Sequence, residues 1–176
     1  KTVNKYQYFY TAMDTYIHCI ESINGKFREP LADTYNDICL KLCKEIFYDK
    51  NIKSYKNRTK LMIASYLSGI AIGNSYVGLV HPISAALSSK FGYHHCLANC
   101  MVMRGMSEYY KKEFNFFWKA VKNHKIVIPK LSNFFRVDDK DIDELYNSII
   151  VHEKPLINAL GNDALKILSK NKIAKI

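Results

Sequence analysis

The chain has 176 residues, of which 48% are hydrophobic and 24% are charged. This length and balance are typical of one globular domain with a sizeable core. The longest apolar stretch, residues 61–80, is broken by serines, glycines and an asparagine, which favours a buried helix over a membrane span. The opening KTVNKYQYFY lacks the apolar run of a signal peptide, so a cytoplasmic protein is expected. Because the chain begins without Met, we expect it to be a piece of a longer protein.

The formal charge is +10, from 26 Lys and Arg against 16 Asp and Glu. A basic balance can indicate nucleic acid, an anionic membrane surface or an anionic small substrate as the partner. Here the basic residues are scattered and form no run of five or six. The pattern favours an ordinary solvated surface, and neither a nucleic acid nor a membrane is expected as a partner.

The cysteine pattern indicates free thiols. The five cysteines are odd in number, form no CxxC motif, and include two pairs four residues apart on probable helices. Buried thiols in a reducing compartment fit this pattern better than a disulfide framework does.

Helical periodicity predominates along the chain. The pattern predicts helices at about 6–22, 31–48, 58–77, 81–90, 95–110, 115–124, 138–152 and 163–169. Residues 126–130 (IVIPK) are expected to be extended, and residues 132–137 are expected to form a loop. The predicted fold is therefore all-α, in one domain that spans residues 1–176.

The first two predicted helices each have an apolar face. On the first helix it is formed by Phe9, Met13, Tyr16, Ile17 and Ile20, and on the second by Tyr35, Ile38, Leu42, Ile46 and Phe47. The third predicted helix is rich in alanine and glycine, so we expect it to pack closely against its neighbours.

Asp14 and His18 stand four residues apart on the first predicted helix, about one turn from each other. A carboxylate and an imidazole so placed can share a divalent ion. They can equally form a hydrogen-bonded pair without a metal, and this pair alone favours that interpretation, because polar pairs at this spacing are common on helices.

Three of the six histidines lie close together at His81, His94 and His95. A short helix followed by a turn at Gly92 would bring His95 back towards His81. With Asp14 and His18 the chain then offers one carboxylate and three imidazoles. This mixed nitrogen and oxygen donor set suits Fe²⁺ or Zn²⁺ better than Mg²⁺ or Ca²⁺.

These motifs resemble those of the iron-containing (group III) alcohol dehydrogenases, in their C-terminal helical half. The family pattern joins a MDxxxHxxE helix to a GxxHxxxH segment and then to a histidine in PHGxAN. The corresponding residues here are Met13 to Glu21 (MDTYIHCIE), Gly78 to His81 (GLVH) and His94 to Asn99 (HHCLAN). Order and spacing agree over about 90 residues.

The resemblance implies that Asp14, His18, His81 and His95 bind the metal, with Glu21 in a supporting or packing role. It also implies the dehydroquinate-synthase-like fold and hydride transfer from an ion-bound, deprotonated alcohol to a nicotinamide cofactor, NAD(P). The family binds its dinucleotide through an N-terminal α/β domain. No glycine-rich motif of that kind occurs here, so that domain is expected outside this chain. A homodimer is a further expectation.

The chain departs from the family at three positions. Ala85 stands where relatives keep a histidine close to substrate and nicotinamide, His94 replaces a common proline, and Cys96 replaces a glycine. His94 is therefore the candidate catalytic residue, as a substitute proton acceptor. His152 is a weaker candidate, since a solvated histidine at a helix end explains it better.

A narrower pattern bears on the substrate. GLVHPxSA, HHCxANCxVM and VHEKPLINALG resemble the subfamily that oxidises the C8 hydroxyl of 3-deoxy-D-manno-octulosonate, a sugar acid of bacterial lipopolysaccharide, to an aldehyde. Alternatives are a general iron or zinc alcohol dehydrogenase for another alcohol or polyol, a metal-stabilised helical domain without catalysis, and a basic nucleic-acid-binding domain.

Overall fold

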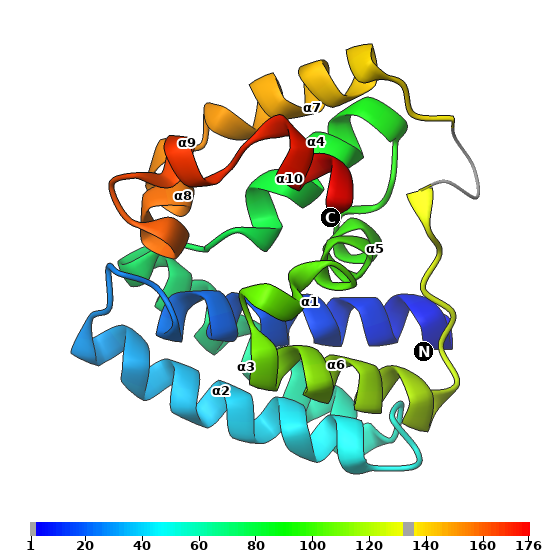
Figure 1. The fold of residues 1–176 in the computed structure, drawn as a ribbon. Coiled ribbons are helices and arrows are strands. Elements are labelled where there is room, and N and C mark those ends of the chain that lie inside the picture. Colours follow the sequence, from blue (N-terminus) through cyan, green and yellow to red (C-terminus); the bar gives the residue numbers. More distant parts are fainter. Residues whose placement is uncertain (1–2, 132–135) are drawn as a thin grey trace.

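The computed structural model describes residues 3–131 and 136–176 as a packed set of helices (Figure 1). Helix α1 crosses the middle of the molecule, with α2 and α6 on one side of it and α4, α5 and α7 on the other (Figure 1). In chain order the elements are α1 (Lys5–Ile23), α2 (Pro30–Tyr48), α3 (Tyr55–Ser75), α4 (Val80–Phe91), α5 (His95–Met103), the 3₁₀ helix η1 (Met106–Glu108), α6 (Lys111–His124), α7 (Asp139–Ile150), α8 (Glu153–Leu160), α9 (Ala164–Ile167) and α10 (Lys170–Lys175).

The all-α prediction is confirmed. Over residues 3–131 and 136–176 the structure contains no β-strand, and residues 126–130 are extended without pairing. The predicted loop at 132–137 lies largely outside the described residues.

Several predicted boundaries were wrong. The predicted helix 95–110 ends at Met103, because Gly105 approaches the C-terminal segment closely: an added Cβ would lie 2.8 Å from the Cα of Ile176. The helix predicted at 163–169 is shorter, and α10 follows it. Helix α8 was not predicted, although Gly161 at its C-terminal end, with φ +82°, is a recognisable stop signal.

The apolar face predicted for α1 is confirmed. Phe9, Met13 and Ile17 are fully buried, at successive i, i+4 positions. This spacing holds one side of α1 in the core. Asp14 and His18 each follow one of these buried residues, so the packing of α1 fixes both polar side chains at the edge of the core.

The face predicted for α2 is confirmed at its C-terminal end, where Ile46 and Phe47 are buried, and was wrong in the first half of the helix. Ile38 is 47% exposed, whereas the buried stripe contains Asn36, Cys39 and Cys43. A small thiol and an amide carry little weight in a hydrophobic pattern, yet the buried Asn36 donates from its Nδ2 to Ser22 Oγ at 2.6 Å. All five cysteines are buried and free, as predicted.

A sharp bend between α3 and α4 positions the first turn of α4. The two helix axes meet at 107°, and Tyr76 at the end of α3 adopts a positive φ of 62°. In the part of the chain that is described, no single helix is long and apolar enough to cross a membrane. Only α3 and α4 counted together have the required length and apolar composition, and they are bent sharply against each other. The bend brings His81 towards α1.

The close packing predicted for α3 holds on one face only. Ala64 and Ala71 are fully buried, but the space next to Gly69 and Gly73 is open. The two glycines therefore lie on the exposed face of the helix.

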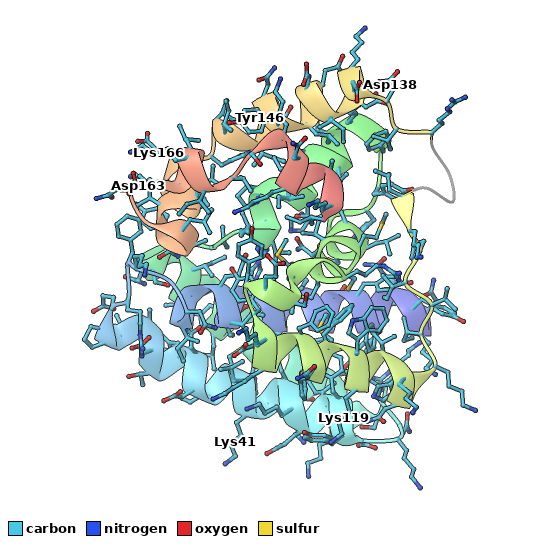
Figure 2. The ribbon with its side chains drawn as sticks, in the orientation of Figure 1. Lys41, Lys119, Asp138, Tyr146, Asp163 and Lys166 are labelled. Carbon is cyan, nitrogen blue, oxygen red and sulfur yellow. The ribbon has the colours of Figure 1, made fainter. Side chains whose placement is uncertain are left out.

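Charged side chains project from several helices towards different sides of the molecule (Figure 2). Lys41 on α2 and Lys119 on α6 lie far from Lys166 on α9 (Figure 2). Lys166 forms an ion pair with Asp163 at 2.8 Å. This is the distribution of a solvated surface.

Candidate metal centre

Three helices bring the four predicted ligands together. Asp14 Oδ1 on α1 lies 3.8 Å from His18 Nε2, one turn further along the same helix. The same oxygen lies 3.4 Å from His81 Nε2 on α4 and 3.6 Å from His95 Nε2 on α5. The short helix α4 and the turn at Gly92, where φ is +70°, bring His95 back towards His81, as predicted.

These spacings suit a small divalent ion. Donors that lie about 2.0–2.2 Å from an ion in a tetrahedral arrangement are about 3.4 Å from one another. Ligand atoms of Asp14, His18 and His81 all lie within 4.8 Å of one another, and the rings of His18 and His81 stack at 4.6 Å. One carboxylate and three imidazoles are also the donor types that Fe²⁺ and Zn²⁺ accept.

The protonation states of Asp14, His18 and His95 favour the binding of a cation. Burial would raise the pKa of Asp14, but the hydrogen bond with His81 and the neighbouring His18 and His95 hold it well below its usual range. Burial is also the main cause that lowers the pKa of His18, to about 4, and that of His95. At neutral pH Asp14 is therefore ionised, and His18 and His95 are neutral bases.

Glu21 holds His81 from behind. Its side chain is fully buried, and its Oε2 accepts a hydrogen bond from His81 Nδ1. Its other oxygen, Oε1, accepts from the backbone N–H of Val80 and, at 3.3 Å, from the hydroxyl of Tyr110. A carboxylate on one ring nitrogen directs the lone pair of the other nitrogen towards a metal. The supporting role predicted for Glu21 matches this geometry, whereas no sequence pattern pointed to Tyr110.

The glycine at position 78, in the GLVH motif, is required for steric reasons. A Cβ at this position would lie 2.7 Å from the hydroxyl of Tyr110 and 3.1 Å from Glu21 Oε1. Only glycine therefore allows the chain before α4 to pass over these two side chains without displacing them.

Two further groups contact the cluster. Ser68 Oγ on α3 lies 3.4 Å from His18 Nδ1, the ring nitrogen turned away from Asp14. On the other side, Cys96 Sγ donates a weak hydrogen bond at 3.4 Å to Asp14 Oδ2. The thiol that replaces the family glycine thus restrains one oxygen of the carboxylate and leaves the other directed at the histidines.

We predict that affinity for a divalent ion rises with pH. Burial would lower the pKa of His81, but the charges and hydrogen bonds of Glu21 and Asp14 outweigh burial and raise it to about 9. The ion must displace this proton, so apparent affinity should rise about tenfold per pH unit between pH 6.5 and 9 and then level off. By the same linkage, His81 stabilises the metal-free fold fully below pH 6.5, and this contribution disappears as pH rises through 9.

The measurement is a Zn²⁺ competition titration at a series of pH values, with proton release recorded by calorimetry in two buffers. One proton released per ion is expected at pH 7.5. Affinity that does not change between pH 6.5 and 8.5 would contradict the assignment of His81 as a ligand.

Two further histidines were candidate functional residues. His94 is exposed at the N-cap of α5, and its Nδ1 lies 3.4 Å from Gln7 Nε2. Its catalytic role stays a prediction. His152 lines an open depression together with Ala85, the position where the family keeps a histidine. The sequence favoured His94 because it is next to the ligand His95. The structure instead places His152 at the same depression as Ala85.

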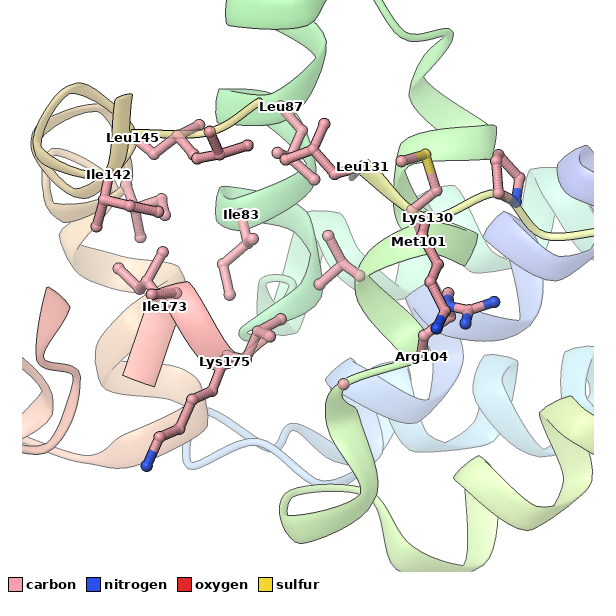
Figure 3. A pocket seen from close by; sticks show the side chains of 17 residues that line it. Ile83, Leu87, Met101, Arg104, Lys130, Leu131, Ile142, Leu145, Ile173 and Lys175 are labelled. Atoms are coloured by element: carbon pink, nitrogen blue, oxygen red, sulfur yellow. The ribbon is translucent and has the colours of Figure 1, made fainter. Parts of the chain in front are cut away.

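The chain also contains an apolar cavity of about 430 Å³ (Figure 3). Its wall includes Ile83 and Leu87 of α4, Ile142 and Leu145 of α7, and Ile173 of α10 (Figure 3). None of the four candidate ligands lines it. This apolar cavity is therefore separate from the polar cluster.

Comparison with known proteins agrees with the family resemblance of the sequence motifs. Residues 8–151 match the model of the C-terminal part of the Fe-containing alcohol dehydrogenase family. The chain is 30% identical over 95 residues to the NAD-dependent methanol dehydrogenase of Bacillus methanolicus. That alignment covers 53% of this chain and 25% of the relative.

Solved structures show the same fold. The alcohol dehydrogenase of Oenococcus oeni superposes with a TM-score of 0.77 and 16% identity, over 98% of this chain and 52% of that one. Sulfoacetaldehyde reductase of Bifidobacterium kashiwanohense, solved in complex with NAD⁺, superposes with a TM-score of 0.73 and 15% identity, over 98% and 49%. The chain thus spans about half the length of these solved relatives.

Proposed function

Since the chain belongs to the Fe-containing alcohol dehydrogenase family, we propose that it is the metal-holding half of an oxidoreductase that converts a primary alcohol to an aldehyde. The observation that carries the proposal is that three imidazole nitrogens lie 3.4–3.8 Å from one oxygen of an ionised carboxylate. Asp14, His18, His81 and His95 would hold Fe²⁺ or Zn²⁺. Such an ion supplies a Lewis acid that lowers the pKa of a substrate hydroxyl.

The protein's own residues orient this centre. Glu21 keeps the proton of His81 on Nδ1, so that Nε2 remains a donor atom. The side chain of His95 is 46% exposed, against 11% for His81 and 14% for Asp14. Substrate therefore reaches the centre from the side of His95, and the other ligands face the core.

The redox partner is proposed to lie on a separate domain. A hydride acceptor of the nicotinamide type requires a dinucleotide-binding unit, and this chain spans about half of its solved relatives. We place that unit, which would bind NAD(P), outside the 176 residues. The 176-residue chain alone should bind the ion but show little or no turnover.

The proposed substrate is 3-deoxy-D-manno-octulosonate, oxidised at its C8 hydroxyl. Support comes from the resemblance of GLVHPxSA, HHCxANCxVM and VHEKPLINALG to 3-deoxy-D-manno-octulosonate 8-oxidase. Ala85, in place of the family histidine, favours a substrate different from that of the general dehydrogenases. A general dehydrogenase for another polyol is the second candidate.

The test is an assay of the full-length protein with this sugar acid and a panel of alcohols and polyols, with NAD⁺, with NADP⁺ and with oxygen. We expect an aldehyde at C8 of the sugar acid and at least tenfold slower turnover of simple alcohols. Preference for another polyol would replace the substrate assignment. No turnover by a metal-loaded protein would favour a non-catalytic domain, and substantial turnover by the 176-residue chain would overturn the division into two domains.

A further inference from the structure

Asn99 on α5 is a fifth polar group in contact with the cluster. Its side chain is fully buried, one turn after His95 on the same face of the helix. Its Nδ2 donates to Asp14 Oδ1 and lies 3.1 Å from His95 Nε2 and 3.3 Å from His81 Nε2. One amide nitrogen therefore touches three of the four candidate ligands.

The spacing of this nitrogen is that of a ligand atom. The three histidine nitrogens lie 3.4–3.8 Å from Asp14 Oδ1, and the amide nitrogen lies about as close to His81 and His95. An amide nitrogen suits the metal-free cluster, because its two hydrogens can serve the Asp14 carboxylate and the neutral His95 ring. It does not suit the loaded cluster, because an N–H donor would face a cation.

The oxygen of the same amide is the unpaired atom of this side chain. Asn99 Oδ1 is buried and has no hydrogen-bond partner among the residues that the structure describes. A buried, unpaired carbonyl is costly and requires an explanation. A half-turn of the carboxamide exchanges its oxygen and nitrogen without moving the rest of the side chain.

We propose that Asn99 presents its Oδ1 as a further ligand when the ion binds, and that its Nδ2 replaces the cation when the ion leaves. The proposal rests on the assignment of the cluster as a metal site. It adds a neutral oxygen donor to one carboxylate and three imidazoles.

Binding of Co²⁺ to the purified 176-residue chain tests this, because the visible spectrum of Co²⁺ depends on its number of ligands. In Asn99→Leu, which has a similar shape but no donor, we expect about tenfold weaker binding and a stronger absorption, as for fewer ligands. In Asn99→Asp we expect about tenfold tighter binding, because the added ligand carries a charge. The same variant should melt at a lower temperature in EDTA, because two carboxylates then face each other without a cation.

Asn36 provides the matched control. It is also a fully buried helical asparagine whose Oδ1 is unpaired, but its Nδ2 donates to Ser22 Oγ. Asn36→Asp should lower the melting temperature without changing the Co²⁺ spectrum or, beyond about twofold, the affinity.

The outcomes separate the two proposals. Parent-like affinity and spectrum in Asn99→Leu, or weaker binding in Asn99→Asp, would overturn the ligand role of Asn99 and leave the metal site intact. Absence of Co²⁺ binding by the parent chain would overturn the metal site and this inference with it.

Discussion

The His95→Ala variant is expected to bind a divalent ion about 100- to 1,000-fold more weakly than the parent chain. Structural metal sites with four ligands contribute about 10–16 kcal/mol, so the loss of one ligand removes about a quarter of that energy. His95 is the suitable ligand to replace because its side chain is 46% exposed. Its loss should therefore change the free energy of unfolding little. The measurement is Zn²⁺ competition against a chromogenic chelator, with the metal content of the purified protein.

The neighbouring histidine is the matched control. His94→Ala removes an exposed imidazole one residue away, which contacts Gln7. Its affinity for Zn²⁺ should equal that of the parent chain, whatever the residue does in turnover. If His95→Ala retained the parent affinity, or if His94→Ala lost as much, the ligand set proposed here would be wrong.

The second large effect is expected at Glu21. Glu21→Ala should lower the free energy of unfolding of the metal-free protein by about 3–5 kcal/mol, the usual effect of breaking a buried ion pair. It leaves the His81 imidazolium without its buried partner, and it leaves the backbone N–H of Val80 unpaired. Urea denaturation in EDTA at pH 7 measures this change.

A more conservative change at the same position separates stability from metal binding. Glu21→Gln retains an oxygen that can accept from Val80, so its stability loss should be smaller. Its amide can donate to His81 Nδ1, which shifts the ring proton to Nε2 and blocks the metal-binding atom. Affinity for Zn²⁺ should then fall about 10- to 100-fold.

An exposed glutamate serves as the control for both changes. Glu45 on α2 is 43% exposed in its ion pair with Lys60. Glu45→Gln should leave both the free energy of unfolding and the metal affinity close to those of the parent chain. Parent-like metal affinity in Glu21→Gln would show that Glu21 packs the core without setting the ring proton of His81.

Some features of this protein follow from local spacing. Asp14 and His18 were identifiable as neighbours because a helix repeats every 3.6 residues, whatever surrounds it. The buried face of α1 followed from the same rule. The same helical spacing predicts that Asn99 lies next to His95, one turn further along α5. It was not identified as a candidate because asparagine is a less common metal ligand than histidine.

Other features depend on contacts between distant segments. The buried face of α2 was misplaced because hydrophobic patterns give little weight to Cys39 and Asn36, and only the packing with α1 and α3 buries them. The role of Tyr110 was invisible in the sequence because its partner Glu21 is 89 residues away. No periodicity connects two such positions.

By itself, the sequence determined the helical class and, through its motifs, the four candidate ligands, because helical spacing and the choice of donor atoms are local properties. Only the tertiary structure decided which groups support them. The buried carboxylate behind His81, the amide among the ligand nitrogens and the exposure of His95 all result from the meeting of α1, α4 and α5. Their chemistry depends on distances of a few ångströms between residues far apart in the chain, and such distances exist only once the core has packed.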